Sequence, residues 1–223
     1  MKIVGLVQCK NEWGLIALSI SHALLNHVDE VYVLNDASTD QTYHGLEHLK
    51  ALWGNRLHIF NARDVGFRKE AAVNVLLQFC QRSKPDWVYN FDADEFLLTQ
   101  NNISLREVLQ RAGPEVKAIR YELVNYISLR DFDDANLNDY LRLRYKSIPV
   151  MQGNMDAARR AGMVYEGAAT FFDMPFMTKL VFRAFPFMFI SNGAHYVRNL
   201  RTGGHVKDAM TSDFRVAHLS MLT

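Results

Sequence analysis

Three carboxylates lie within four positions of one another, at Asp92, Asp94 and Glu95. They follow the apolar run of residues 88–91, whose β-branched and aromatic side chains predict a buried strand. Like charges at this spacing repel one another unless protons or a cation intervene. A hard divalent cation is the natural partner, because it prefers oxygen ligands and shares its shell with phosphate oxygens. The cluster predicts a metal site for a phosphorylated ligand, and the alternative is an acidic loop.

The direction of these side chains depends on the backbone that carries them. In an extended segment side chains alternate with a period of two, so Asp92 and Asp94 are expected to point to the same side. Glu95 is then expected to point away from them, toward a helix start or a basic neighbour.

Two further polar residues, Gln8 and Asp36, also follow predicted strands. In open α/β sheets ligands bind at the carboxyl ends of the strands, so Gln8, Asp36 and Asp92 are expected to line one edge. Such an edge suits a nucleotide, because Asp36 can accept from a base N–H while a metal at Asp92 and Asp94 holds a diphosphate. The alternative for Asp36 is a turn residue before a helix, and spacing alone does not separate the two.

The elements that must position these residues alternate regularly in the first half of the chain. Near-continuous apolar runs predict strands at residues 2–8, 30–34, 57–60 and 88–91. Apolar residues spaced by three and four predict helices over 13–24 and 71–79 and around 46–49, and Ser38, Thr39 and Asp40 are candidate N-caps for the helix around 46–49. Four β–α units predict an α/β fold, a three-layer sandwich with a mostly parallel central sheet.

The pattern changes after residue 98. A capping box of Ser104 and Glu107 predicts a short helix through residue 109. Strands are predicted at residues 118–124, 178–185 and 215–219, while most of residues 140–189 has weak periodicity. We expect one domain over residues 1–223, with a ligand-binding half at 1–98 and a second half at 99–223 that contacts the other reactant.

The composition excludes several classes of function. Lys and Arg number 25 against 24 Asp and Glu, so nothing global indicates nucleic acid as a partner. The start of the chain becomes charged too soon for a signal peptide, and charges interrupt the apolar region at 171–190. Cys9 and Cys80 each lie in an apolar segment and are expected to be buried thiols in a reducing compartment. We therefore expect a cytoplasmic protein.

Three ordered motifs resemble those of the family 2 glycosyltransferases, which have the GT-A fold. Residues 35–42, Asn-Asp-Ala-Ser-Thr-Asp-Gln-Thr, resemble the family signature Asp-Asp-Gly-Ser-x-Asp-x-Thr. Residues 10–12, Lys-Asn-Glu, resemble the turn after the family's first strand, and residues 91–96, Phe-Asp-Ala-Asp-Glu-Phe, resemble its Asp-x-Asp metal motif. The resemblance covers residues 2–98 and is faint beyond residue 100. Asn35 and Ala37 depart from the usual Asp and Gly.

The resemblance implies a role for each matching residue. Gln8 and Lys10 would flank the base of a nucleoside-diphosphate sugar, and Asp36 would accept from uracil or another base. UDP is the nucleotide that the resemblance favours. Asp92 would lie near the ribose or the metal, and Asp94 would bind Mn²⁺ or Mg²⁺. The basic positions near the diphosphate in the family are matched by Arg63, Arg68 and Lys69.

The resemblance also directs attention to late residues. His218 resembles the histidine that completes the metal shell in related enzymes, whereas His205, after two glycines, is a weaker candidate on a mobile segment. His195 is the third late histidine. An inverting transfer needs a carboxylate to deprotonate the acceptor hydroxyl. The candidates by location are Glu166 and Asp173, followed by Asp131, Asp133 and Asp134.

The sequence thus predicts a metal-dependent, inverting glycosyltransferase acting on a carbohydrate or glycoconjugate acceptor. Two alternatives stay open: a non-catalytic nucleotide-binding module, and a phosphatase that forms an aspartyl-phosphate. A sugar-nucleotide pyrophosphorylase would share this type of fold, but such enzymes have a Gly-rich, Arg-containing loop near the N-terminus. That loop is absent here, because residues 7–10 contain no glycine. Seven phenylalanines within residues 171–189 are expected mainly in the core. An acceptor wall, a dimer interface or a peripheral membrane contact is the alternative for Phe171, Phe172, Phe176, Phe182, Phe185, Phe187 and Phe189.

Overall fold

The first half of the chain alternates strands and helices, as predicted. The computed structural model describes residues 1–62, 69–101, 103–127, 145–146, 162–163, 165 and 178–219. Four strands of this half lie side by side in the order β3-β2-β1-β4, and every neighbouring pair is parallel. The elements are β1 (Ile3–Cys9), α1 (Trp13–Asn26), β2 (Glu30–Asp36), α2 (Thr42–Trp53), β3 (Leu57–Ala62), α3 (Lys69–Cys80) and β4 (Trp87–Asn90).

The second half extends the same sheet with mixed directions. The order continues β4-β8-β6-β11-β5, and β7 pairs with β6. Strand β8 is antiparallel to both β4 and β6, β11 is parallel to β6, and β5 is antiparallel to β11. These elements are β5 (Glu95–Thr99), α4 (Leu105–Arg111), β6 (Ala118–Ile127), β7 (Tyr145–Lys146), β8 (Lys179–Arg183), β9 (Met188–Ile190), β10 (Val197–Asn199) and β11 (Asp208–Leu219). Strands β9 and β10 form a separate antiparallel pair.

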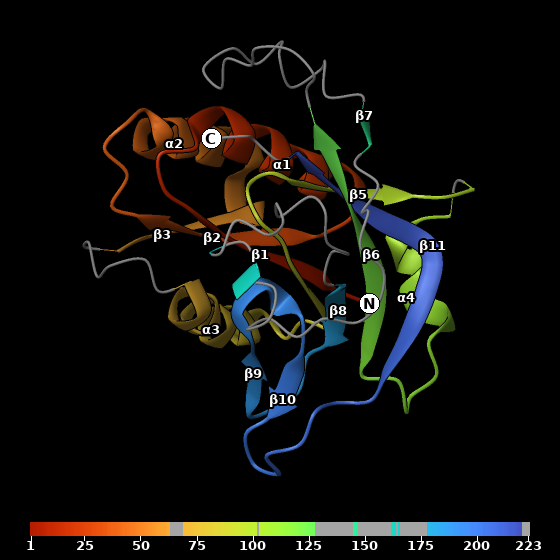
Figure 1. Ribbon diagram of the computed structural model, residues 1–223. Coiled ribbons are helices and arrows are strands. Elements are labelled where there is room, and N and C mark those ends of the chain that lie inside the picture. The colour runs from red at the N-terminus through yellow and green to blue at the C-terminus, as the bar shows by residue number, and fades with distance from the viewer. Residues whose placement is uncertain are drawn as a thin grey trace.

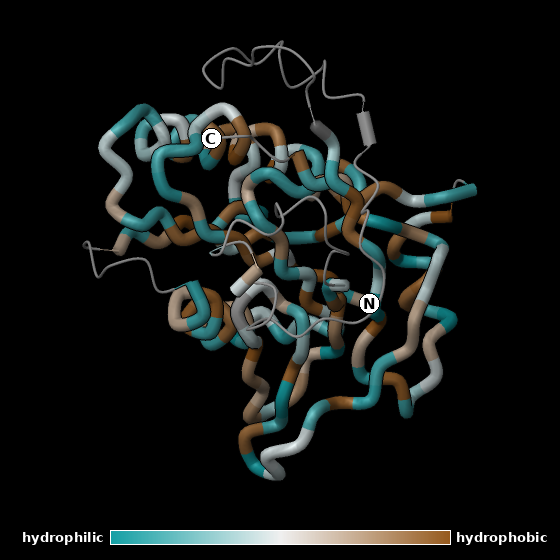
Figure 2. The backbone as a smooth tube through the Cα atoms, in the orientation of Figure 1, coloured by the Kyte–Doolittle hydropathy of each residue, from teal (hydrophilic) through white to brown (hydrophobic). Residues whose placement is uncertain are grey.

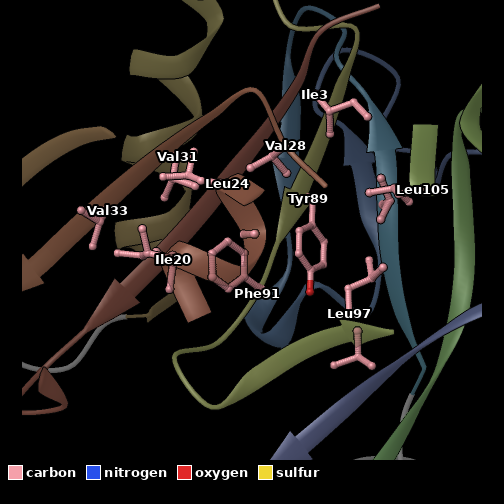
Figure 3. Close-up of a cluster of buried hydrophobic side chains, with 14 of the residues drawn as sticks. Ile3, Ile20, Leu24, Val28, Val31, Val33, Tyr89, Phe91, Leu97 and Leu105 are labelled. Carbon is pink, nitrogen blue, oxygen red and sulfur yellow. The ribbon is translucent and has the colours of Figure 1, made fainter. Parts of the chain in front are cut away.

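Helices cover the sheet on both faces, which makes three layers (Figure 1). Side chains from α1, α2 and α4 pack against one face in the larger core cluster. Helix α3 and the β9–β10 pair pack against the other face in a second cluster. Figure 3 shows side chains from α1, β1, β2 and β5 meeting in the larger cluster. The fold is the GT-A type α/β architecture that the sequence predicts.

Strand β1 shows why the chain folds this way. All seven of its residues are buried, and alternate side chains enter opposite clusters: Ile3 and Val7 the larger one, Val4 and Leu6 the second. Gly5 leaves room for its neighbours, since a Cβ there would lie 3.0 Å from the ring of Phe91. Burial on both faces is typical of a central parallel strand.

A second close approach joins the first two helices. The indole ring of Trp13, at the start of α1, lies directly on the backbone of Gly45 in α2. A Cβ at residue 45 would overlap that ring, so the packing of the two helices depends on glycine at this position.

Several local predictions are confirmed and others are wrong. The capping box of Ser104 and Glu107 opens α4, and Cys9 and Cys80 are free, buried thiols. Helix α2 begins later than expected, with Gln41 as its N-cap, while Asp40 Oδ1 accepts from the backbone N–H of Thr42 at 2.9 Å. The strand after the carboxylate cluster, β5, was not predicted, and neither were the short β9 and β10.

The phenylalanines of residues 171–189 do not share one environment. Phe182 is fully buried, Phe185 and Phe189 are half-buried, and Phe187 is 59% exposed, so the expectation of core burial is wrong for Phe187. Three of the seven, Phe171, Phe172 and Phe176, lie outside the described residues. Among the helices that the structure describes, none is long and apolar enough to cross a membrane.

Candidate active site

A pocket of about 260 Å³ opens at the carboxyl ends of β1 and β4. Loops that follow these two strands supply most of its wall, the start of α3 supplies Lys69, and the end of β11 supplies His218. The structure therefore gathers residues from four separate parts of the chain. The lining residues are Gln8, Cys9, Lys10, Glu12, Lys69, Asp92, Ala93, Asp94 and His218.

Asp36 is a buried carboxylate that no described residue stabilises by a hydrogen bond. It is 1% exposed, and both of its oxygens lack a hydrogen-bond donor among the described residues. The Lys10 ammonium lies 3.9 Å from Oδ2. The buried Oε1 of Gln8, on the neighbouring strand, also lacks a donor in the described part of the chain. Unsatisfied buried acceptors cost stability, so they indicate a ligand that brings N–H or O–H groups.

The loops after β1 and β2 are joined by one side chain. Asn11 Oδ1 accepts from the backbone N–H groups of Thr39 at 2.7 Å and Asp40 at 3.4 Å. In return, the Asn11 N–H donates to Ser38 Oγ at 3.0 Å. Asn11 adopts a left-handed backbone conformation with φ of 55°, which asparagine tolerates better than most residues. The two loops therefore form one connected wall beside the pocket.

Asn35, the departure from the family signature, has a structural role of its own. Its Oδ1 accepts from the Ser38 N–H at 3.2 Å, and its Nδ2 donates to Asn61 Oδ1 at 3.0 Å. An amide can make both bonds at once, whereas an ionised carboxylate only accepts. Ala37, the second departure, has a φ of 50°, which explains why glycine is usual at this place in the family signature.

The segment that carries Asp92 and Asp94 is a turn, so the extended backbone expected there is wrong. Strand β4 ends at Asn90, and the Glu95 N–H donates to the Asp92 carbonyl at 3.1 Å. The Asp92 N–H donates in turn to Glu95 Oε2 at 3.1 Å. This short turn still places Asp92 and Asp94 in the wall of one pocket.

Two lysines neutralise Asp92. Lys69 Nζ lies 2.6 Å from Oδ1, and Lys179 Nζ lies 2.9 Å from Oδ2. Burial would raise the pKa of Asp92, but the two ammonium groups outweigh it and hold the pKa below its ordinary range. Asp92 is therefore ionised at neutral pH.

Lys179 of β8 is a buried cation between two carboxylates. It is 3% exposed, and its ammonium also forms an ion pair with Oε1 of Glu95, which is 2% exposed. Burial would lower the pKa of Lys179, but Asp92 and Glu95 raise it above its ordinary value. Burial raises the pKa of Glu95, and Lys179 acts in the opposite direction. Burial prevails here because Glu95 is more deeply buried than Asp92 and contacts one lysine, which it shares with Asp92. Glu95 thus has a basic neighbour, as expected, but it does not point away from Asp92, because its Oε2 accepts from the Asp92 N–H and the two carboxylates share Lys179.

Asp94 forms an ion pair with His218 across the pocket. Asp94 Oδ2 lies 2.9 Å from His218 Nε2, and His218 Nδ1 lies 2.7 Å from Asn125 Oδ1. Because the amide oxygen only accepts, Nδ1 carries a proton and the ring orientation is fixed. Burial would lower the pKa of His218, but Asp94 raises it above its ordinary value. Asn125 is fully buried in β6, which explains why it can hold the ring.

Two other ionisable groups line the pocket. Burial raises the pKa of Glu12 to about 7, although the Lys10 N–H, which donates to Oε2 at 3.2 Å, acts in the opposite direction. Burial also raises the pKa of the Cys9 thiol well above its ordinary value, so this thiol is protonated and unreactive at neutral pH.

Most of the predicted site residues in the described part of the chain meet here. Gln8, Lys10, Lys69, Asp92, Asp94 and His218 line the pocket, and Asp36 lies beside Lys10. Two late histidines lie elsewhere: the His205 ring packs against the edge of Tyr196, and His195 bonds to the Thr178 carbonyl. The predictions for Arg63, Arg68, Glu166 and Asp173, and for Asp131, Asp133 and Asp134, fall outside the described residues.

Sequence reasoning missed Glu12 as a pocket residue, Lys179 and Asn125. Lys179 did carry a signal, because a single lysine inside an apolar strand needs a buried anion. Asn125 had a weaker signal of the same kind, as an amide within β6. Within the described residues, no three His, Cys, Asp or Glu side chains are arranged as a ready-made metal site. Asp94 and His218 can therefore supply only part of a metal shell.

The family profile of Glycosyl transferase family 2 matches residues 6–156. The chain therefore belongs to glycosyl transferase family 2. It is 28% identical over 165 residues to uncharacterized proteins of Mycobacterium tuberculosis (strain ATCC 25618 / H37Rv) and Mycobacterium bovis (strain ATCC BAA-935 / AF2122/97), which covers 71% of this chain and 36% of each relative. The chain spans about a third of the length of these curated relatives.

Solved glycosyltransferases resemble the fold. The crystal structure of GalNAc-T7 with UDP, GalNAc and Mn²⁺ matches with a TM-score of 0.55 and 11% identity, covering 100% of this chain and 44% of that one. A mannosyltransferase from Pyrobaculum calidifontis, in complex with GDP-Man and Mn²⁺, matches with a TM-score of 0.42 and 23% identity, covering 53% of this chain and 34% of that one. Membership of the family excludes the aspartyl-phosphate phosphatase considered above.

Proposed function

We propose that this chain transfers a sugar from a nucleoside-diphosphate sugar to an acceptor hydroxyl with the help of a divalent cation. The observation that carries the proposal is a pair of buried acceptors, Asp36 and Gln8, that have no donor among the described residues and lie beside a pocket that also holds Asp94 and His218. A nucleotide supplies what both parts lack: a base with N–H groups and a diphosphate that binds metal.

The base would bind between the ends of β1 and β2. Asp36 accepts from a ring N–H of the base, and uracil is the base that the family resemblance favours. The Lys10 ammonium, 3.9 Å from Asp36 Oδ2, compensates part of the negative charge of this carboxylate. The cost of burying Asp36 is then offset by a hydrogen bond from the ligand, which is stronger when the acceptor is charged.

The donor set at Asp94 and His218 fits Mn²⁺, and it fits Mg²⁺ less well. A carboxylate oxygen and an imidazole nitrogen, 2.9 Å apart, can turn to one ion, and Asn125 holds the imidazole as metal-binding histidines require. The remaining ligands would come from phosphate oxygens and water, as is usual for these ions. When bound, the cation supplies neutralisation of the charge that develops on the departing diphosphate.

Lys69 would move from Asp92 to the diphosphate. Its side chain is 27% exposed at the pocket wall, whereas that of Lys179 is 4% exposed and held between two carboxylates. Asp92 then keeps one ammonium and gains the neighbourhood of the ribose and the metal. This exchange gives Lys69 a binding role and leaves Lys179 to hold the turn.

We also propose that the reaction inverts the anomeric carbon, with the catalytic base supplied by the second half of the chain, residues 99–223. An acceptor hydroxyl must lose its proton as the new bond forms, which a carboxylate can accept. Glu166 and Asp173 remain our candidates for this base. Replacing each by its amide should abolish transfer while leaving nucleotide affinity unchanged, and NMR of the product's anomeric carbon would report inversion or retention.

Calorimetry of UDP and GDP, with and without Mn²⁺, tests the binding proposal. Asp36→Asn should weaken UDP binding at least tenfold in both conditions, because a neutral amide oxygen accepts from the base N–H more weakly than a carboxylate does. Asp94→Asn should remove only the gain in affinity that Mn²⁺ gives. The matched control is Glu47→Gln, an exposed acid on α2 away from the pocket. Unchanged UDP affinity in Asp36→Asn would refute the base site.

A turnover assay separates the enzyme from a non-catalytic nucleotide-binding module. The protein would be incubated with individual nucleotide sugars and Mn²⁺, and the products would be identified by mass. Release of free nucleotide from one sugar donor supports transfer chemistry and identifies the donor. Tight binding of UDP without turnover of any donor would favour the binding module.

A further inference from the structure

The β9–β10 pair and the loop that follows it form a basic surface. Residues 184–207 contain no aspartate or glutamate. They contain three residues with full positive charge, and all three side chains are exposed. These three residues are Arg198, Arg201 and Lys207. In the described part of the chain, none of them forms an ion pair with a carboxylate.

Two large apolar side chains project from the open end of the β9–β10 pair, where the chain enters β9 and leaves β10, and we call Phe187 and Leu200 with their backbone the hairpin tip. Phe187 is 59% exposed and Leu200 is 62% exposed. The Leu200 N–H donates to the Phe187 carbonyl at 2.7 Å, so the two residues are direct neighbours. The loop between β10 and β11 forms the lower end of the molecule in Figures 1 and 2.

The backbone of Phe187 is unusual. Its φ of 61° lies in the left-handed region, which a bulky residue rarely adopts. Such strain persists only where surrounding structure enforces it, and it is concentrated at functional places. Here the strained conformation presents an aromatic ring to solvent, where burial in the core would have been the ordinary fate.

The arginines lie over the aromatic rings of this surface. The Arg201 guanidinium is 6.0 Å from the centre of the Phe187 ring, and that of Arg198 is 5.3 Å from the Tyr196 ring. Sugars bind proteins by stacking on open aromatic faces, and here a guanidinium covers one face of each ring. Like charges also disfavour the tip of a second copy. A glycan platform and a self-association surface are therefore weaker explanations.

We propose that the hairpin tip docks on an anionic membrane surface. Phe187 and Leu200 enter the boundary between headgroups and acyl chains, while Arg198, Arg201 and Lys207 pair with lipid phosphates. An exposed apolar pair on a surface with arginine and lysine side chains that form no ion pair among the described residues is the chemistry of interfacial anchors. Each cation near an anionic membrane contributes about fivefold in partitioning.

Docking in this way leaves the pocket open. The tip precedes the first residue of β11, whereas His218 lies near its last residue. Because β11 is bulged between Met210 and Arg215, it runs beside only residues 118–126 of β6 and spans about 26 Å. Nucleotide binding and membrane binding are thus expected to be independent. This inference does not rest on the proposed function, and each can fail alone.

Co-sedimentation with vesicles tests the inference on the full chain. Wild-type protein should bind to vesicles of phosphatidylcholine that contain roughly one third phosphatidylglycerol. It should bind much less to vesicles of phosphatidylcholine alone. Binding should fall steeply as salt rises, because salt screens the charges. Absence of binding to the anionic vesicles at low salt would overturn the proposal.

Variants distinguish the tip from general stickiness. Phe187→Asn together with Leu200→Ser should reduce vesicle partitioning at least tenfold, and asparagine tolerates the φ of residue 187. Arg201→Gln alone should reduce it about fivefold. The matched controls are Leu52→Ser, a leucine 72% exposed on α2, and Arg82→Gln, whose guanidinium lies over Phe79.

Each outcome decides the question. Unchanged circular dichroism and unchanged thermal melting in the tip variants, with lost vesicle binding, support the proposal. Equal losses in the tip variants and in the controls would overturn it. Binding of the wild type to an acidic polysaccharide with no binding to anionic vesicles, or dimerisation that the tip variants abolish, would overturn it in favour of those partners.

Discussion

Replacing Lys179 with methionine should destabilise the protein strongly, and more at high pH than at low pH. Methionine keeps the length and apolar stem of the side chain but removes the ammonium. Lys179 Nζ lies 2.9 Å from Asp92 Oδ2 and also contacts Glu95, with 4% of its side chain exposed. Its loss leaves Glu95 as a buried carboxylate without its cation.

The magnitude follows from these contacts. With an effective dielectric constant near 20, one ion pair at this distance gains about 6 kcal/mol before the cost of desolvation is subtracted. Breaking a buried pair by removing one partner costs about 3–5 kcal/mol in measured cases. Lys69 still neutralises Asp92, so we expect the lower end, about 3 kcal/mol at pH 8.

The pH dependence has a definite sign. Burial already raises the pKa of Glu95, and without Lys179 the pKa rises further. As pH falls, Glu95 takes up a proton in the folded variant and the penalty for the bare charge disappears. The difference in unfolding free energy between wild type and Lys179→Met should therefore shrink from pH 8 to pH 5.

Urea unfolding monitored by circular dichroism at several pH values measures this difference. Lys69→Met is the matched control, because Lys69 contacts the same Asp92 at 2.6 Å but is 27% exposed and should cost less than about 1 kcal/mol. Adding Glu95→Gln to Lys179→Met should restore most of the loss. Equal costs for the two lysine variants, or no restoration by Glu95→Gln, would refute the reasoning.

Three further predictions concern stability. Burial raises the pKa of Glu12 to about 7, so the folded state favours the neutral form of this side chain. Glu12→Gln should therefore gain about 2 kcal/mol of stability relative to wild type as pH rises from about 5 to 8, measured by urea unfolding. A difference that does not change with pH would contradict this. Burial lowers the pKa of His27 to about 4, so wild type should lose about 2 kcal/mol as pH falls from about 6.5 to 4. His27→Gln should flatten that acid limb in thermal melts, and an unchanged limb would count against the assignment. Gly45→Ala should cost about 1–3 kcal/mol, because the new Cβ overlaps the Trp13 ring; a gain of up to 1 kcal/mol, as helix propensity alone predicts, would show that the ring moves freely.

The part of the fold that sequence reasoning predicted is the part with local periodicity. The first four strands show continuous apolar runs, and parallel pairing then brings Gln8, Asp36 and Asp92 to one edge of the sheet. The region from β8 to β10 was predicted less well. Three-residue strands such as β9 and β10 are too short to show a period of two.

The contacts that were missed depend on pairing across long separations. Lys179 meets Asp92 because β8 inserts antiparallel beside β4, 87 residues later in the chain. Nothing local to either residue specifies that neighbour. The turn at Asp92 is likewise closed by Glu95, whose conformation depends on Lys179. The charge cluster was visible in the sequence, while the strand pairing that brings Lys179 to it was not.

The bond network of Asn11 has a consequence for how this site can change. Asn11 Oδ1 accepts from two N–H groups of the loop after β2, so the loops after β1 and β2 are one mechanical unit. Exchange of the 37–40 segment alone, for example to alter which base is read, would break that unit unless Asn11 is kept or replaced in concert. Substitutions in one of these two loops are therefore expected to require matching substitutions in the other. Libraries that randomise both loops together should contain more folded members than libraries that randomise one loop alone.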